Sequence, residues 1–234
     1  MSRHALARCV VFRVNFLAHC ALASDAAAIL HADVLDGLLA GAIIADFSKG
    51  KIPSDWPTSV AAGVRLHRRI DSATNQLPAI KVSCNRFPKH LRRLAPIFID
   101  ILGDYHLSQT WSDYYTAELD EFSKHCYAAV RRHSDLLPER GQRFITYLEH
   151  VDLLANGADW ANIENAIASV LRRLRSDLSL SETAATVYNL ATATRQEFDA
   201  YYPECIQLAR AWSTDYAASI DAISAAPNTA DETH

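Results

Sequence analysis

The chain is poor in the residues that build turns. Its 234 residues include only 7 glycines and 8 prolines, whereas a sheet protein of this length needs turn residues wherever the chain reverses direction. Hydrophobic residues make up 50% of the sequence and charged residues 21%, a balance that excludes general disorder and is sufficient for a buried core. The sequence therefore predicts an all-α fold, with the helices packed into a single-domain bundle.

Cysteine is scarce, and long apolar runs are missing. The 5 cysteines are odd in number and form no C-x-x-C pair, so neither a disulfide framework nor a zinc knuckle is indicated. The longest apolar run, residues 34–47, is closed by Asp46 and falls short of the ~20 residues that a membrane span requires. We therefore expect a cytoplasmic protein in a reducing compartment, with no membrane partner.

Several catalytic motifs are absent as well. The sequence has no G-x-S-x-G, no P-loop and no G-x-G-x-x-G, which argues against a serine hydrolase, a P-loop nucleotide enzyme and a dinucleotide-binding fold. The scattered thiols offer no recognisable pairing of a cysteine nucleophile with a histidine. A pI of about 6.2 and few aromatic residues within the basic stretch argue against a nucleic-acid partner.

Apolar periodicity and helix-breaking residues place the helices. The expected ranges are 14–23, 33–47, 58–74, 119–133, 139–155, 160–175 and 182–212. Pro78 begins a further helix that Pro88 interrupts, and Pro96 is expected to kink or split the segment that follows. Residues 1–13 show no periodic pattern and are predicted to be an N-terminal extension. Residues 213–234, rich in Ala, Ser and Asp, are predicted to be a flexible tail.

Two pairs of residues spaced by four carry groups that bind metals. His67 and Asp71 form one pair, and Asp100 and Asp104 form the other. Because a helix brings residues four apart onto one face, each pair points in one direction. Carboxylates on largely apolar helices need a partner that offsets the cost of burying their charge. The spacing therefore predicts that something cationic lies between these side chains.

Two other apolar helices each contribute one more such group, His19 and Asp46. A lone buried histidine is usually a hydrogen-bonded core residue, but four carboxylates with two histidines exceed what capping or ion pairing requires. Mixed histidine and carboxylate ligands suit Mn²⁺, Mg²⁺ or Fe²⁺, and Zn²⁺ less well because thiolates are missing. The alternative is that nearby arginines neutralise the carboxylates, which would give the cluster a structural role.

Charge is unevenly distributed along the chain. The net charge is −4, yet residues 49–93 contain ten Lys or Arg against two Asp, a local charge of +8. Such a stretch attracts an anionic ligand or an acidic protein, unless it is only a solvated face. Arg68 and Arg69 follow His67 closely enough to contact phosphate oxygens. Because a metal ion polarises a phosphoryl oxygen and activates water, the combination indicates phosphoester hydrolysis.

Ordered blocks of the sequence resemble the acyl carrier protein phosphodiesterases, helical metal-dependent enzymes regarded as relatives of the HD-type phosphohydrolases. The blocks are residues 15–19, 45–47, 67–71 and 92–111, with a weaker echo at 198–203. The resemblance covers residues 14–212 and implies an HD-like helical bundle. It also implies hydrolysis of the phosphodiester that joins 4'-phosphopantetheine to a serine of holo-acyl carrier protein, which leaves the apo-carrier, with Mn²⁺ as the usual metal.

The resemblance further implies a site and a partner. Two histidines and three aspartates would surround one divalent metal ion, namely His19, Asp46, His67, Asp71 and Asp104. Asp100 would orient a ligand or the attacking water from outside that ring, and Arg68 or Arg69 would hold the phosphate. Acyl carrier protein is strongly acidic, so basic side chains would contact it, namely Arg65, Arg86, Lys89 and Arg92.

Two features depart from the family pattern. The chain contains no His-Asp dipeptide, and Ala45-Asp46 stands in its place. The family tends to have a histidine directly after this aspartate, whereas here Asp104 is followed by Tyr105 and only then by His106. Because one residue is a rotation of about 100° on a helix, His106 cannot simply replace that histidine. Two other functions stay open: a helical phosphohydrolase of a nucleotide or another small phosphodiester, and a non-catalytic module that binds an acidic protein.

Overall fold

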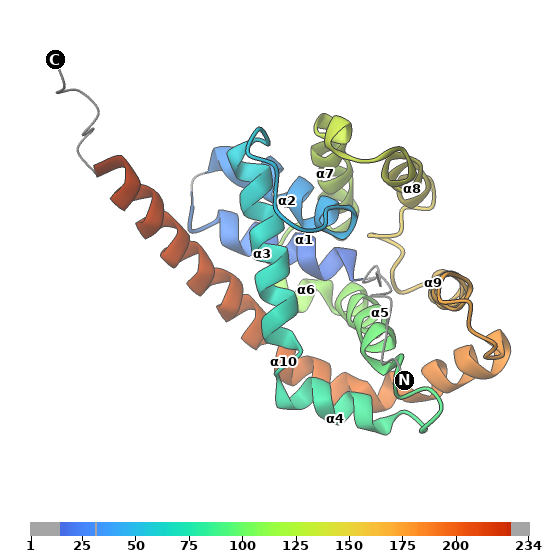
Figure 1. The fold of residues 1–234 in the computed structure, drawn as a ribbon. Coiled ribbons are helices and arrows are strands. Elements are labelled where there is room, and N and C mark those ends of the chain that lie inside the picture. Colours follow the sequence, from blue (N-terminus) through green and yellow to red (C-terminus); the bar gives the residue numbers. More distant parts are fainter. Residues whose placement is uncertain (1–14, 31, 226–234) are drawn as a thin grey trace, which may run out of the picture.

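The structure, a computed structural model, describes residues 15–30 and 32–225 (Figure 1). Every regular element within these residues is helical, so the predicted all-α, single-domain fold is confirmed; the likeness to HD-type enzymes stays a prediction. Within the same ranges, no helix is both long and apolar enough to cross a membrane. The α-helices are α1 (Phe16–Ala27), α2 (Leu35–Ile44), α3 (Thr58–Thr74), α4 (Pro78–Arg86), α5 (Ala95–Gln109), α6 (Trp111–Tyr114), α7 (Leu119–Arg132), α8 (Glu139–His150), α9 (Trp160–Arg173) and α10 (Leu180–Ala225).

Short 3₁₀ turns and prolines mark several helix boundaries. The 3₁₀ elements are η1 (Ala32–Val34), η2 (Ala45–Phe47) and η3 (Ser134–Leu136). Pro78 stands at the start of α4, as predicted. Pro96 also lies in the first turn of its helix, α5, where its missing N–H is not needed. The prediction that Pro96 kinks or splits a helix is therefore wrong, because the helix begins at this position.

The last helix is longer than the sequence predicts. α10 has 46 residues and continues to Ala225, and Ser213 is fully buried. Trp212 stacks on Tyr216, with ring centroids 4.8 Å apart. The predicted flexible tail is therefore wrong for residues 213–225, because alanine-rich sequence favours a helix wherever one face finds a packing partner. The remaining residues of that tail and the predicted extension, 1–13, lie outside the described residues.

The core consists of two clusters of buried side chains that α10 connects. One cluster gathers α1, α2, α3, α7, α8 and the middle of α10. The other gathers α4, α5, α9 and the beginning of α10. Figure 1 shows α10 running along the base of the molecule beside α4 and then turning upward past α1. A buried carboxylate fixes this course, because Asp25 of α1 accepts hydrogen bonds from Arg210 (2.8 Å) and from the hydroxyl of Tyr115 (2.9 Å).

Glycines allow α2 and α3 to pack backbone against backbone. A Cβ atom on Gly41 would lie 2.4 Å from the carbonyl oxygen of Val60, and one on Gly63 would lie 2.5 Å from that of Leu38. Side chains do not tolerate such distances, so only glycine permits this close approach. The consequence is that the carbonyl group of Ala42, next to Gly41, comes within reach of a side chain on α3.

Candidate metal centre

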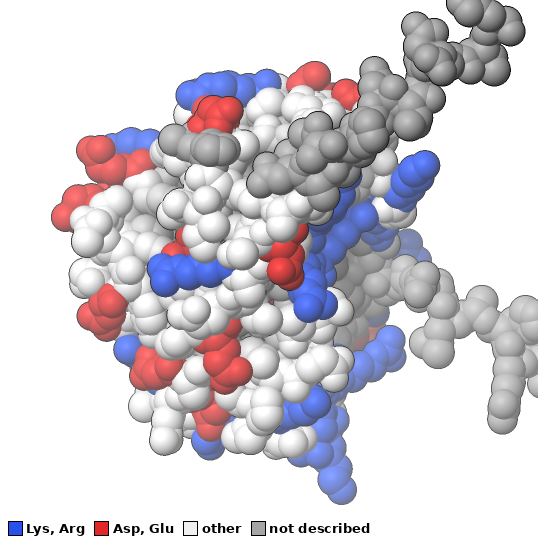
Figure 2. Space-filling view, turned by 90° about the vertical axis from the view of Figure 1, so that its left-hand side faces the viewer, with Lys and Arg blue, Asp and Glu red and all other residues white. Residues whose placement is uncertain are grey.

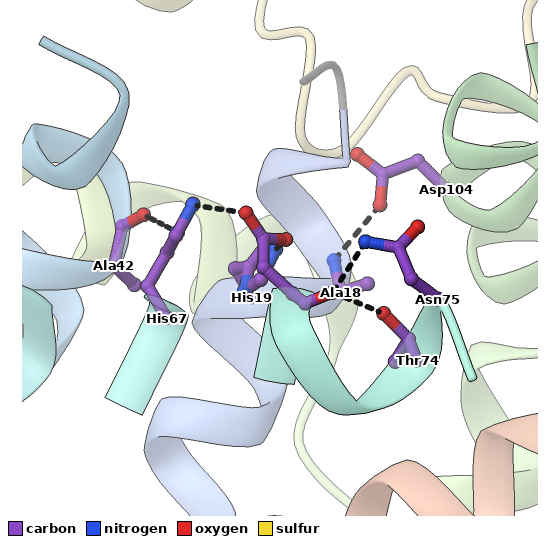
Figure 3. A network of polar contacts seen from close by, with 8 residues as sticks. Ala18, His19, Ala42, His67, Thr74, Asn75 and Asp104 are labelled. Atoms are coloured by element: carbon purple, nitrogen blue, oxygen red, sulfur yellow. Dashed lines mark hydrogen bonds and ion pairs between the residues drawn. The ribbon is translucent and has the colours of Figure 1, made fainter. Parts of the chain in front are cut away.

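The side chain that Ala42 contacts is His67, one turn after Gly63 on α3. Its Nδ1 lies 2.7 Å from the carbonyl oxygen of Ala42 (Figure 3). A carbonyl can only accept, so Nδ1 carries the proton and donates it. In the neutral ring, Nε2 therefore presents a lone pair that a metal ion could accept, and in the protonated ring the same nitrogen carries an N–H that faces the Asp71 carboxylate. A histidine whose second nitrogen is held by a backbone carbonyl is the usual arrangement of a metal ligand.

His19 of α1 completes the cluster. Its ring stacks on the ring of His67, with centroids 3.8 Å apart and planes inclined by 17°. The Nε2 of His19 lies 3.3 Å from Oδ1 of Asp71, and the Nε2 of His67 lies 3.5 Å from Oδ2. Both imidazoles are buried, whereas the Asp71 side chain is 23% exposed. The carboxylate of Asp71 is therefore the side of the cluster that faces solvent.

The separations of these donor atoms fit a single metal ion. One ligand atom from each of His19, His67 and Asp71 lies within 4.8 Å of the other two. Ligand atoms about 2.1 Å from a common ion lie about 3.0 to 3.4 Å apart in octahedral or tetrahedral coordination. The two nitrogen–oxygen distances, 3.3 and 3.5 Å, lie within and just above that range, and two imidazoles with one carboxylate form a donor set that Mn²⁺ and Fe²⁺ accept.

Electrostatics supports the view that Asp71 balances a cation. Burial opposes ionisation of Asp71, but hydrogen bonds and charge from His19 and His67 outweigh it and hold the pKa of this carboxyl well below its usual value. Burial likewise acts to lower the pKa of His67, yet the hydrogen bond to Asp71 and the charge of Asp46 raise that pKa overall. The site therefore stabilises positive charge beside an ionised Asp71.

Asp46 is close enough to influence this cluster but is outside its tightest part. It lies in η2 directly after α2, and its negative charge contributes to the raised pKa of His67. It is not a member of the group whose ligand atoms lie within 4.8 Å of one another. The structure thus brings together His19, His67 and Asp71 and leaves Asp46 as a neighbour.

Asp104 takes a different position from the one predicted. Its Oδ2 accepts a hydrogen bond from the backbone N–H of Leu17 (3.0 Å). Its Oδ1 accepts one from the backbone N–H of Ala18 (2.9 Å), which Figure 3 shows. These donors belong to the first turn of α1, whose N–H groups have no partner within the helix. Burial raises the pKa of Asp104 to about 8, although the two N–H donors oppose this shift. Asp104 caps α1 and so positions His19; direct coordination by Asp104 is not supported.

Asp100, one turn before Asp104, borders a small cavity beside the cluster. The cavity has a volume of about 30 Å³ and is lined by Asn15, His19, Asp100 and Tyr201, among others. The side-chain oxygen of Asn15 is buried and has no hydrogen-bond partner among the described residues. A cavity of this size with several polar groups in its wall accommodates a water molecule. The predicted role of Asp100, to orient water from outside the ligand ring, stays a prediction that this position allows.

The two predicted phosphate-binding arginines do not point into the cluster. Arg68 donates hydrogen bonds to the carbonyl oxygens of Gly50 (2.7 Å) and Ser48 (2.8 Å), so its guanidinium holds the loop that follows Asp46. Arg69 is exposed, and two residues correspond to about 200° of helix rotation, which places it opposite His67. The sequence could not distinguish these directions, because both arginines simply follow the histidine.

The predicted docking residues divide into two kinds. Arg86 forms an ion pair with Glu197, and Arg92 donates to the carbonyl oxygens of Asn85 (3.2 Å) and Phe87 (3.3 Å). Arg65 and Lys89 are exposed. Figure 2 shows Lys and Arg side chains gathered along the right-hand edge of the face in view, with acidic side chains spread over its left and lower part.

His106 faces α10 and not the cluster. Its Nε2 lies 3.2 Å from the hydroxyl of Thr194, and its ring packs against that of Phe198. Burial, together with the charge of Arg195, lowers the pKa of His106 to about 4, so the ring is neutral at pH 7. His106 is therefore a core residue here and does not replace the histidine that the family tends to carry after its aspartate.

Fold and cluster together define an all-α protein with a candidate metal site made of two histidines and one carboxylate. A sequence model described as acyl carrier protein phosphodiesterase matches residues 14–205, a range that contains every residue of the cluster. The chain belongs to the acyl carrier protein phosphodiesterase family.

Individual relatives extend over the same range. A protein of Shigella boydii serotype 18, named acyl carrier protein phosphodiesterase, is 33% identical over 195 residues, which cover 81% of this chain and 94% of that protein. Proteins with the same name from Yersinia enterocolitica (29% identity, 84% of this chain and 98% of the relative) and Escherichia coli O6:H1 (32%, 84% and 97%) are also similar. No solved structure matches the chain.

Proposed function

We propose that this protein is a divalent-metal-dependent phosphodiesterase that hydrolyses the bond between 4'-phosphopantetheine and the serine of holo-acyl carrier protein and releases the apo-carrier. The observation that carries the proposal is the cluster of His19, His67 and Asp71 inside the segment that the family model matches. The names of the relatives support acyl carrier protein as the substrate, and the donor atoms of the cluster support metal-dependent hydrolysis.

His19, His67 and Asp71 would hold the metal ion, with Asp46 beside them. Mn²⁺ is the ion we propose, with Mg²⁺ and Fe²⁺ as alternatives, because the donors are nitrogen and oxygen atoms without thiolates. Bound there, a divalent cation supplies polarisation of a phosphoryl oxygen and a lowered pKa of water.

The remaining residues act by positioning. Ala42 fixes the ring of His67 through its carbonyl oxygen, and Asp104 fixes the helix that carries His19. Arg68 holds the backbone just after Asp46. Because the exposed part of the cluster is the carboxylate of Asp71, the phosphodiester would approach from the solvent side of α3. Such fixed ligand geometry reduces the reorganisation needed during reaction.

An acidic carrier protein is the proposed partner, and the cytoplasm is the proposed location. Exposed cations on α3 and in the segment after α4, including Arg65, Arg69 and Lys89, support the docking of an acidic surface. Long-range attraction between exposed charges is screened by salt, and charges at the rim of an interface act mainly on the rate of association. We therefore expect the affinity for the carrier to fall as the salt concentration rises.

The test is incubation of the purified protein with holo-acyl carrier protein and Mn²⁺, followed by mass spectrometry of the carrier. We expect the carrier to lose the mass of phosphopantetheine, the reaction to stop with EDTA and to resume when excess Mn²⁺ is added. A carrier that binds but keeps its prosthetic group would identify a docking module. Hydrolysis of nucleotides without hydrolysis of the carrier would identify a different phosphohydrolase.

A further inference from the structure

A groove of about 520 Å³ opens between α8 and α9. Its first wall is aromatic and consists of Phe16, Phe47, Phe144 and Tyr147. The ring of Phe144 lies 5.7 Å from the ring of Phe16 and 5.7 Å from that of Phe47, measured between centroids. Tyr147 is 46% exposed. This α8/α9 groove is therefore a cleft with an apolar wall that solvent reaches.

The α8/α9 groove adjoins the candidate metal centre along the chain. Phe47 directly follows Asp46 in η2. Phe16 lies on α1 three residues before His19, a spacing that places both on neighbouring parts of one helix face. α1 and η2, which carry His19 and Asp46, thus also contribute Phe16 and Phe47 to the lining of the groove, so an extended ligand with its phosphate at the metal centre could place its remaining length there.

α9 contributes the other wall, which carries a row of polar side chains between apolar ones. Asn162, Asn165 and Ser169 all line the groove, and their spacing of three or four residues aligns them along one side of the helix. Arg172 lines it one turn further along. Amide side chains both donate and accept hydrogen bonds, so they can pair with the N–H and C=O groups of an amide-containing ligand while the arginine attracts a negative charge.

We propose that the α8/α9 groove binds the pantetheine arm of the carrier, an inference that rests on the proposed function. The arm is a chain with two amide bonds, a dimethyl-substituted carbon and a terminal thiol. Its amides suit the α9 wall, its hydrocarbon parts suit the aromatic wall, and its phosphate end would lie toward Asp46 and the metal centre. The volume of the groove lies within the range of about 300 to 1,000 Å³ for small-molecule sites.

The experiment measures binding of free pantetheine, which lacks the phosphate and therefore does not report on the metal centre. Calorimetric titration of the Mn²⁺-loaded protein compares the parent with Ala168→Trp, which fills the α8/α9 groove. The matched control is Ala185→Trp, which fills the separate groove between α9 and α10. We expect Kd for pantetheine to rise at least 10-fold in Ala168→Trp and to stay at the parent value in Ala185→Trp.

A second pair of variants, with smaller substitutions at exposed positions, tests the same inference with less risk of misfolding. Asn165 and Asn189 are both exposed and line different grooves. Asn165→Leu is expected to weaken pantetheine binding several-fold, and Asn189→Leu is expected to leave it unchanged. The inference is overturned if pantetheine does not bind the parent, if Ala168→Trp and Asn165→Leu bind it as the parent does, or if octanoate binds the groove and pantetheine does not.

Hydrolysis of the carrier separates this inference from the proposed function. If the parent converts holo-carrier to apo-carrier while Kd for pantetheine is the same in the groove variants as in the parent, the proposed function holds and the groove assignment fails. If pantetheine binds in the groove but holo-carrier is not hydrolysed, the groove assignment stands and the function fails. Where both hold, Ala168→Trp should raise KM for holo-carrier about as much as it raises Kd for pantetheine.

Discussion

Two aspartates, on two helices that both pack against α1, have the same sequence spacing but different chemical surroundings. Asp71 of α3 and Asp104 of α5 each follow another polar residue by four positions. Asp71 faces the imidazoles of His19 and His67, and its pKa is held low. Asp104 faces backbone N–H groups of Leu17 and Ala18, and burial raises its pKa.

The difference arises from α1, which contacts both helices. To α3 it presents a side chain, that of His19, and to α5 it presents the unpaired N–H groups of its first turn. A carboxylate that meets imidazole nitrogens can share a metal ion with them, whereas one that meets backbone N–H donors becomes a cap. The spacing on α3 and α5 fixes only which way a carboxylate points, and the element opposite decides what it does.

The largest effect that tests this contrast is expected from Asp71→Ala. The variant removes the proposed anionic ligand, so bound metal and turnover should both fall by more than the roughly 10- to 100-fold typical of residues that only orient ligands. Metal analysis and the carrier assay measure the two quantities. Asp36→Ala is the matched control, because Asp36 is also a helical aspartate beside a histidine, His125, and pairs with Arg132 as well. This control variant should keep the metal content of the parent. Full metal content in Asp71→Ala would assign that carboxylate a structural role.

The next largest effect is expected at Asp100, which borders the small cavity beside His19. Asp100→Ala should reduce turnover by about 10- to 100-fold, the range for groups that act through a ligand or a water. Metal content should remain at the parent level, which distinguishes this variant from Asp71→Ala. Loss of metal together with activity would instead place Asp100 among the ligands.

Asp104→Ala should act mainly on stability. It leaves two backbone donors of α1 without their acceptors, a cost of about 1–3 kcal/mol in free energy of unfolding. Asp104→Asn keeps one acceptor oxygen and should lose less. Denaturant unfolding measures both, and metal analysis at saturating Mn²⁺ should give parent values. If Asp104→Asn instead lost its metal without loss of stability, Asp104 would be a ligand after all.

The pH dependence of folding stability in the parent and in Asp104→Asn tests the burial of Asp104. Because the pKa of Asp104 is about 8 in the folded protein and about 4 in the unfolded chain, the folded state holds a proton that the unfolded state releases. The stability of the parent should therefore decrease, relative to Asp104→Asn, as pH rises from about 4 to 8. The opposite slope would show that the N–H donors of α1 outweigh burial.

The smallest effect is expected from the two arginines that follow His67. Arg68→Gln loses hydrogen bonds to Ser48 and Gly50, so we expect about 1 kcal/mol of lost stability and a few-fold loss of activity through the Asp46 loop. Arg69→Gln should leave kcat unchanged and raise KM for the carrier only at low salt. A large fall in kcat for Arg69→Gln would restore the predicted phosphate contact.

The sequence predicted most helices and part of the site. The bounds of α3 agree with the predicted 58–74, because a loop with prolines precedes the helix and a clear apolar period runs through it. His19, His67 and Asp71 come together as expected. The length of α10 was not foreseen, since the packing of Trp212 and Tyr216 depends on neighbours that no local pattern reveals.

By itself, the sequence determined the all-α class, the directions in which His67 and Asp71 point and the family, because helix period and ordered motifs are local properties of the chain. Only the tertiary structure decided that Ala42 orients His67, that Asp104 caps α1 and that Arg68 holds a loop. Each of those roles depends on a backbone group, and every residue carries the same backbone groups. Which of them meets a given side chain is therefore set by how the helices pack.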